Sequence, residues 1–378
     1  MSWEYKTLDQ LGEVSRGRSK HRPRNDPSLF GGKYPFIQTA DVKAANFYIT
    51  EYDTTYNEKG LAQSRLWNPG TLCITIAANI ADTGILAMDA CFPDSVMGFL
   101  PYEGIADVRF VKYCFDILQQ NCKKISQGAA QDNLSWEKLS TILFPAPPIE
   151  VQTKIADILS AYDDLIENNR KQIKLLEEAA QRLYKEWFID LRFPGHETTP
   201  IVDGVPEGWF TAAVTDLLEI RYGKDHKALG DGEIPAYGSG GIIRRVNKVL
   251  YSGESVLIPR KGSLNNILLV SGDFWTIDTM FYSIPKRPNI AKYIYLYLSG
   301  VDMYAMNIGA AVPSMTVKIL EGMKLLCPTD HVVESFEETV RPYFDMIELL
   351  KNKIVSLAEA RDKLLPKLMS GEIEVENI

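Results

Sequence analysis

The sequence predicts an α+β protein in which two similar mixed α/β domains are separated by two long helices, with a pseudo-twofold internal repeat. Two observations predict this fold: the chain repeats its own sequence, and each copy ends in an apolar pattern with a 3.5-residue period. A length of 378 residues exceeds one ordinary domain, and 46% hydrophobic with 24% charged residues is typical of globular proteins.

The internal repeat has a spacing that shortens along the chain. WEYKTLDQLGEVSRGRSK (3–20) aligns with WFTAAVTDLLEIRYGKDH (209–226), YPFIQTADV (34–42) with IPAYGSGGI (234–242), and GAAQDNLSWEKL (128–139) with GAAVPSMTVKIL (309–320). The offset falls from 206 to 200 and then to 181, so the second copy is shorter inside its body. Deletions between aligned ends are typical of trimmed loops on a shared fold.

Each copy has a body with both strand and helix patterns. Short apolar runs bounded by Gly, Pro or Asn predict strands over 72–77, 255–259 and 266–270. Longer apolar patterns predict helices over 108–120 and 291–306. The two bodies are therefore mixed α/β.

The long helices carry apolar residues that step by four and three. A 3.5-residue period keeps such a stripe facing a partner helix, and the simplest partner for each helix is the other one. The predicted seam consists of Ile155, Leu159, Tyr162, Ile166, Asn169, Ile173, Leu176 and Leu183 in the first helix, and of Phe336, Val340, Tyr343, Ile347, Leu350, Ile354, Leu357 and Leu364 in the second. Asn169 and Arg361 interrupt the stripe, and polar seam residues tend to fix the register. The alternative is a pair of amphipathic helices that each pack on a globular core.

Prolines mark the ends of these helices. Pro147 and Pro148 predict the start of the first helix, and Pro366 predicts a kink or an end of the second near Leu365. The expected domains are 1–148, a helical region 149–190, a linker 191–208, a second domain 209–329, and a second helical region with the C-terminal tail over 330–378.

The net charge of −8 is concentrated in the helical regions. Residues 149–190 contribute −3 and residues 331–378 contribute −4, so the two bodies are almost neutral. No run of eighteen apolar residues predicts a membrane span, and the first residues lack the apolar segment of a signal peptide. Five cysteines without a CxxC pair indicate reduced thiols, so we expect a cytoplasmic protein.

A basic loop, RGRSKHRPR (16–24), stands out in this acidic chain. Clustered guanidinium groups suit phosphates or guanine edges, and 221–227, 242–248 and 258–266 supply basic and amide groups in the second copy. The candidate DNA-binding residues are Arg16, Arg18, Lys20, Arg22, Arg24, Gln38, Thr39 and Lys43 in the first copy, and Lys224, His226, Lys227, Ser239, Arg244, Arg245, Arg260, Lys261 and Asn265 in the second. The alternative is a solvated surface loop without a ligand.

Motifs for catalysis are missing from the sequence. There is no Asn/Asp-Pro-Pro-aromatic run for amino methylation, no GxxxxGK[ST] loop for ATP, and no nuclease pattern after Pro93-Asp94. The four histidines have no metal-ligand spacing. The acidic pairs Asp163-Asp164 and Glu177-Glu178 indicate solvated or partner-facing charge, so we expect no catalytic and no metal-binding residues.

Three segments resemble the specificity (S) subunits of type I restriction–modification systems. They are QGAAQDNLSWEKLSTILFPAPPIEVQTKIADIL (127–159), EEAAQRLYKEWFIDLRFPGHE (177–197) and RDKLLPKLMSGEIEV (361–375). The second copy departs from the pattern at CPTDHVVESF (327–336), so the resemblance implies the second helix without setting its first residue.

The resemblance implies a non-catalytic subunit with two target-recognition domains. Each would read one half of a split double-stranded DNA sequence, and the helices would form an antiparallel coiled coil. The implied partners are two modification subunits, which bind S-adenosylmethionine and methylate adenine, and restriction subunits, which use ATP and Mg. The chain itself would hold no cofactor. The alternative is a coiled-coil scaffold that binds protein partners without recognising a DNA sequence.

The helix length agrees with two separated DNA contacts. Ile155 and Trp187 are 32 residues apart, which is about 48 Å in an α-helix. One turn of DNA is about 34 Å, so domains at the ends of such a helix could face successive major grooves.

Overall fold

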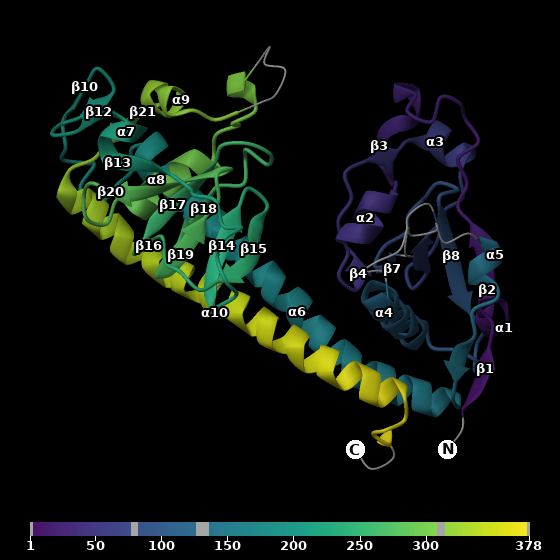
Figure 1. Ribbon diagram of the computed structural model, residues 1–378. Coiled ribbons are helices and arrows are strands. Elements are labelled where there is room, and N and C mark those ends of the chain that lie inside the picture. The colour runs from purple at the N-terminus through teal and green to yellow at the C-terminus, as the bar shows by residue number, and fades with distance from the viewer. Residues whose placement is uncertain (1–2, 77–81, 126–135, 308–313, 376–378) are drawn as a thin grey trace. The chain divides into compact units, whose positions relative to one another are not determined.

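The computed structural model describes residues 3–76, 82–125, 136–307 and 314–375. The chain forms two compact units: unit 1 is Met1–Arg170 with Lys351–Ile378, and unit 2 is Lys171–Leu350. Each unit contains one α/β body and a part of both long helices, α6 (Ile149–Tyr184) and α10 (Asp330–Met369). Figure 1 labels these elements. Of the third repeated stretch, residues 128–135 and 309–313 lie outside the described residues.

The body of unit 1 is built on a five-stranded sheet with the order β2-β8-β6-β7-β4. These strands are β2 (Gly12–Arg16), β4 (Tyr48–Ile49), β6 (Leu72–Thr75), β7 (Thr83–Leu86) and β8 (Val96–Pro101). Neighbouring strands are antiparallel except β4 and β7. Every residue of β6 is buried, because α4 (Val108–Ile125) and the ends of the long helices share one apolar core with this sheet.

Unit 2 repeats this topology with the strand order β13-β20-β17-β18. These strands are β13 (Leu218–Tyr222), β17 (Ser255–Pro259), β18 (Leu268–Val270) and β20 (Met280–Pro285). Gly12 pairs with Pro101 in unit 1, and the equivalent Leu218 pairs with Pro285 in unit 2. The predicted α+β fold with an internal repeat is therefore confirmed.

Smaller elements surround each sheet. In unit 1 they are β1 (Glu4–Lys6), α1 (Leu8–Leu11), η1 (Pro27–Leu29), β3 (Phe30–Pro35), α2 (Thr39–Ala44), β5 (Thr55–Tyr56), α3 (Glu58–Ala62), α5 (Trp136–Leu139) and β9 (Phe144–Ala146). In unit 2 they are η2 (Lys185–Ile189), β10 (Ile201–Val202), β11 (Val205–Pro206), β12 (Phe210–Ala213), α7 (Val214–Leu217), β14 (Ile234–Gly238), β15 (Gly241–Val246), β16 (Tyr251–Ser252), β19 (Asp273–Thr276), α8 (Ala291–Ser299), η3 (Ala305–Asn307), α9 (Val317–Gly322) and β21 (Lys324–Cys327).

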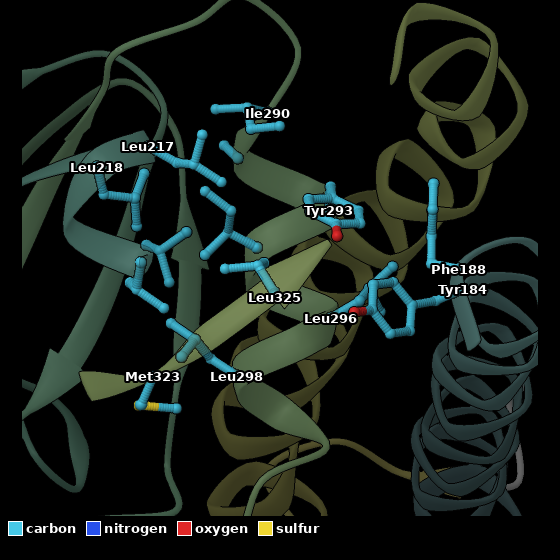
Figure 2. Close-up of a cluster of buried hydrophobic side chains, with 14 of the residues drawn as sticks. Tyr184, Phe188, Leu217, Leu218, Ile290, Tyr293, Leu296, Leu298, Met323 and Leu325 are labelled. Atoms are coloured by element: carbon cyan, nitrogen blue, oxygen red, sulfur yellow. The ribbon is translucent and has the colours of Figure 1, made fainter. Parts of the chain in front are cut away.

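The core of unit 2 joins α8 to both its sheet and the long helices. Figure 2 shows Tyr184, the last residue of α6, and Phe188 of the following η2 beside Tyr293 of α8. Leu217, Leu296 and Leu325 belong to the same buried cluster. Burial of so many large side chains fixes α8 on the sheet. The helix expected over 291–306 is too long, since α8 ends at Ser299 before Gly300.

The long helices begin and end differently from each other. α6 begins at Ile149, directly after the predicted Pro147-Pro148 boundary. The buried Gln152 fastens this start, since its side-chain amide donates to the carbonyl oxygens of Ile105 and Pro147. Of the kink or end expected near Leu365, an end is ruled out, because α10 continues through Pro366 to Met369. Proline is tolerated in this last turn because Leu365 and Leu368 are buried in the unit 1 core.

α6 packs on α10 in antiparallel fashion, as expected. Unit 1 contains the start of α6 and the end of α10, whereas unit 2 contains the end of α6 and the start of α10. In unit 2 the rings of Trp187 and Phe336 lie 5.5 Å apart. All sixteen predicted seam residues are buried or half-buried. Some, such as Ile155 and Phe336, belong to the cores of the bodies, so the helix ends also act as ordinary amphipathic helices.

The prediction of solvated charge at Asp163 is wrong. Asp163 is fully buried, and its carboxylate accepts hydrogen bonds from the Tyr113 hydroxyl, at 2.6 Å, and from the Arg361 guanidinium. Burial raises the pKa of Asp163, while the charge of Arg361 and the Tyr113 hydrogen bond oppose that rise. Asp164, Glu177 and Glu178 are exposed. The polar interruption at Arg361 is therefore a direct ion pair between the two long helices.

Candidate nucleic-acid interface

In unit 1 the basic loop is seated on the turn before β8. We call this turn, residues 92–95, the junction loop of unit 1. The amide of Gly17 donates to the Val96 carbonyl at 2.8 Å, and the amide of Arg18 donates to the Phe92 carbonyl at 2.9 Å. A Cβ at Gly17 would overlap the carbonyl oxygens of Phe92 and Pro93, so this position requires glycine.

Unit 2 repeats the same seat at residues 276–279, its own junction loop. The amide of Gly223 donates to the Met280 carbonyl at 3.0 Å, and that of Lys224 donates to the Thr276 carbonyl at 2.8 Å. A Cβ at Gly223 would overlap the Ile277 carbonyl oxygen. In both units the tight glycine is followed by an exposed basic residue, Arg18 or Lys224.

Further candidate segments meet each junction region, one in unit 1 and two in unit 2. In unit 1 the Ile37 amide donates to Cys91, and in unit 2 the Ile277 amide donates to Tyr237, at 2.8 and 2.9 Å. The Arg260 amide donates to the Thr279 carbonyl at 2.8 Å. Segments that lie far apart in the sequence, 223–227, 237–239 and 260–261, therefore gather at one place in unit 2.

The basic residues of the unit 1 loop are all exposed, but they are not equally free. Arg24 pairs with Asp94 at 2.7 Å, and Arg22 donates to the Ser19 carbonyl at 2.6 Å. Within the described part of the chain, no group pairs with the side chains of Arg16, Arg18 or Lys20. These three cations are therefore available for phosphate groups.

Histidine and aspartate brace the same loop. His21 Nε2 lies 2.7 Å from an Asp26 carboxylate oxygen. The Ser28 amide and hydroxyl, followed by His21, lower the pKa of Asp26 to about 2. Asp26 therefore stays ionised and holds the loop in shape at neutral pH.

Arg65 belongs to this surface although the sequence did not indicate it. Its guanidinium lies over the Trp67 ring at 3.8 Å and donates to the Ser15 hydroxyl at 2.9 Å. Ser15 precedes Arg16 in β2, so the fold brings Arg65 to the basic loop. No sequence signal could have found it, because Arg65 stands alone among uncharged residues, 50 positions after its partner Ser15.

The other candidates of unit 1 lie around α2. Gln38 precedes this helix, and its amide nitrogen Nε2 donates to the Thr54 hydroxyl at 3.4 Å. Thr39 is half-buried at the first helical position, and Lys43 is exposed in the last turn. Gln38 and Lys43 are therefore accessible to a ligand.

Several candidates of unit 2 already have partners within the protein. Arg244 pairs with Asp231 at 2.7 Å, and Arg245 donates to the Glu233 carbonyl at 2.6 Å. Arg260 donates to the Asp278 carbonyl at 2.6 Å and lies over the Tyr222 ring at 4.7 Å. Asn265 donates to Asp302 and accepts from the Met303 amide. These side chains are engaged in contacts within the protein, so they are less available as hydrogen-bond donors to a ligand.

The remaining candidates of unit 2 are more accessible. Lys224, Lys227 and Lys261 are exposed, and Ser239 and His226 are half-buried. The Asn266 side chain donates to the Ser239 carbonyl at 2.8 Å, which holds the 239 turn against the 261–266 loop. The structure therefore brings the lysine-rich segments together on an ordered framework.

Neither a metal centre nor a membrane span is present in the part of the chain that the structure describes. No three His, Cys, Asp or Glu residues in those ranges could jointly hold a metal ion. No described helix has the length and apolarity to cross a membrane. Cys73, Cys91, Cys114 and Cys327 are buried free thiols.

Known proteins are similar to this chain in sequence and in fold. Residues 1–178 match the family described as type I restriction modification DNA specificity domain. The MjaIX specificity subunit of Methanocaldococcus jannaschii is 25% identical, with 100% of this chain and 94% of the relative covered. The HindI specificity subunit of Haemophilus influenzae is 22% identical, with 96% and 98% covered.

A solved structure shares the fold. The type I restriction–modification S subunit from M. genitalium has the same fold, with a TM-score of 0.59 and 16% identity over 97% of this chain and 96% of that one. The resemblance to specificity subunits that the three quoted segments predicted is thus confirmed, and it extends over both bodies. Residues 1–178 thus match a type I restriction modification DNA specificity domain, and over its full length the chain is similar to type I restriction enzyme specificity subunits.

Proposed function

We propose that each unit reads one half of a bipartite duplex DNA target through the surface around its junction loop. The observation that carries this proposal is the repeated seat of Gly17 and Gly223, each followed by an exposed cation. Two equivalent surfaces in one chain suit two half-sites. The chain contributes recognition, while methyl transfer belongs to separate modification subunits.

The charges near the junction loops would bind the DNA backbone first. Arg16, Arg18 and Lys20 have no internal partner among the residues that the structure describes, and their loop is held by His21 and Asp26. Basic side chains of this kind position a protein on phosphates, whereas base contacts supply the specificity. Gln38 in unit 1 and Ser239 in unit 2 are the polar candidates for base contacts.

Two modification subunits would dock on the outer faces of the long helices. In unit 2, Leu175 is 63% exposed on α6, beside the exposed Glu177 and Glu178. A groove of about 550 Å³ lies between the ends of α6 and α8, lined by apolar surface from Tyr184, Ile189, Tyr297 and Val301 and by the charged Glu178, Arg182 and Lys185. An apolar surface edged by charges of both signs suits a partner with apolar side chains and complementary charges.

The cofactors of the assembled system would reside on these partners. S-adenosylmethionine would bind the modification subunits, and ATP with Mg would serve restriction subunits in the cytoplasm. The specificity chain would need none of them for its own fold.

A salt titration of DNA binding tests the unit 1 surface. In the complex with modification subunits, joint replacement of Arg16, Arg18 and Lys20 by Ala should weaken binding. The slope of log K against log salt should fall by up to about 2.7, since each phosphate contact contributes about 0.9. The matched control is Arg24→Ala in the same loop, which should change the slope less because Asp94 already neutralises Arg24. An unchanged slope in the triple variant would contradict this assignment.

Co-purification tests the docking surface. Reversal of charge at Glu177 and Glu178 to Lys should reduce recovery of the modification subunits from co-expressing cells. Reversal at Glu372, an exposed residue after α10, is the control. Equal recovery from all variants would remove α6 of unit 2 from the docking surface.

A further inference from the structure

A β-hairpin of unit 2 has an unusual distribution of side chains. β14 and β15 are joined by Ser239 and Gly240, with Gly238 paired to Gly241 at the base of the turn. The tip therefore has no large side chain. β15 is an edge strand, because β14 is its one neighbour in the sheet order β15-β14-β19-β16. Figure 1 shows the two strands side by side.

Two adjacent isoleucines lie just behind this narrow tip. Ile242 is 55% exposed and Ile243 is 45% exposed. The strand pairing shifts here: Tyr237 pairs with Ile242 and Ala236 pairs with Arg244, so Ile243 is an extra residue in a β-bulge. Bulges re-aim side chains, and this one leaves both apolar side chains open to solvent.

The hairpin is braced at both ends. At its tip, the Asn266 side chain donates to the Ser239 carbonyl at 2.8 Å. At its base, Arg244 pairs with Asp231 at 2.7 Å and Arg245 donates to the Glu233 carbonyl at 2.6 Å. The exposed isoleucines are therefore presented on an ordered ribbon and not on a free loop.

Cations surround this ribbon. Exposed Lys261 follows Arg260, and a Cβ at Gly262 would lie 2.6 Å from the Ser239 hydroxyl, so this loop touches the hairpin tip. Ile277 of the junction loop contacts Gly238 and also underlies the Gly223–Lys224 backbone. Exposed lysines beside an apolar ribbon suit a ligand with anionic edges and apolar groups between them.

Duplex DNA presents this combination in its major groove. The groove is about 12 Å wide, admits a two-stranded β-ribbon, and displays the 5-methyl group of thymine between two phosphate backbones. A protein that inserts a side chain between base pairs would need a large side chain at the tip of the hairpin. The tip of this hairpin has Ser239 and Gly240 instead. The isoleucines stand on the ribbon behind that point.

We propose that the β14–β15 hairpin enters the major groove of the half-site read by unit 2, where Ile242 packs on a thymine methyl group. This inference rests on the proposed function and adds the base that the hairpin selects. Unit 1 has helix α2 after the equivalent strand in place of this hairpin, so the contact belongs to one half-site. Ile243 supports Ile242 from the bulge.

Replacement of thymine by uracil tests the proposal without changing the protein. The complex with modification subunits is titrated with duplexes that carry its target, once methylome sequencing has defined that target, with each thymine replaced in turn. Burial of one methyl group is worth about 0.8 kcal/mol, so one replacement should weaken binding about fourfold. The sensitive thymines should all lie in one half-site.

The protein variant completes the test. Ile242→Ala should bind the thymine duplex more weakly and should no longer distinguish thymine from uracil. Val249→Ala, another exposed β-branched residue of unit 2, should keep the discrimination. Uracil tolerated at every position, or discrimination retained by Ile242→Ala, would overturn the hairpin contact. If the unaltered complex showed no sequence-specific DNA binding, the proposed function would instead be overturned.

Discussion

Arg361→Ala should strongly destabilise unit 1, because it leaves Asp163 as an unpaired buried charge. Asp163 has no exposed surface, whereas the Arg361 side chain is 19% exposed and reaches it from the other long helix. Breaking a buried ion pair from one side typically costs about 3–5 kcal/mol. The Tyr113 hydroxyl remains as a hydrogen-bond donor at 2.6 Å, so we expect the lower end of that range.

The loss of stability in Arg361→Ala should become smaller as the pH falls. Burial raises the pKa of Asp163, and removal of Arg361 removes a charge that opposes the rise. A carboxyl group with a raised pKa in the folded state favours folding when it is protonated. The deficit of Arg361→Ala should therefore shrink as the pH falls from 7 towards the ordinary aspartate value of 3.8, below which both states are protonated.

Hydrogen exchange measures this effect within unit 1. Amides of α4 and of residues 149–170 should lose about 3 kcal/mol of protection in Arg361→Ala at pH 7. Arg170→Ala is the matched control, since the exposed Arg170 pairs with the half-buried Glu167 at 3.1 Å within one helix and its loss should change stability by less than about 0.5 kcal/mol. Equal protection in the two variants, or a deficit that grows at low pH, would refute the reasoning.

Two further predictions concern unit 2. Lys292→Met should cost about 3 kcal/mol or more, because it leaves the buried Glu337 without its 2.7 Å partner. Arg341→Ala removes a half-exposed side chain that lies 3.3 Å from the same carboxylate, and it should cost less than about 1 kcal/mol in urea unfolding, since Lys292 still pairs with Glu337. Gly223→Ala should lower stability by about 1–3 kcal/mol through overlap with the junction loop, whereas Gly322→Ala, with open space around it, should be nearly neutral in the same assay. Stability equal to that of the matched control would contradict either prediction.

The repeat and the helices could be predicted because their signals are local or periodic. The 3.5-residue pattern reports which face of each helix is covered, and the aligned copies imply the same topology twice. Trp67 and Tyr251 illustrate how far the duplication extends: they occupy equivalent bridges, to Ala90 and Phe274, although their types differ. The two copies therefore keep the same strand pairing at positions where their residue types differ.

The errors arise where long-range contacts decide the outcome. Asp163 lies next to a seam position, and its burial depends on Arg361, 198 residues away. Pro366 forms part of the last turn of α10 because flanking leucines are buried against the unit 1 body. The extent of α8 depends on Gly300, at which the helix ends despite the apolar residues that follow.

The candidate interface was predictable in composition but not in detail. Basic character at residues 16–24 is evident from the sequence alone. Which cations are free is not, since Arg24 finds Asp94 and Arg244 finds Asp231 only in the folded chain. Arg65 and the exposed Ile242 carry no motif, so only the fold places them on these surfaces.

Methylome sequencing after a change in helix length tests the central claim most directly. One heptad is inserted into α6 after Arg170 and one into α10 before Lys351, where the two units meet in the sequence. If each unit reads its own half-site and the helices set the spacing, both half-site sequences should stay the same while the number of bases between them changes. Methylation at the original spacing, or a changed sequence in either half, would contradict the account.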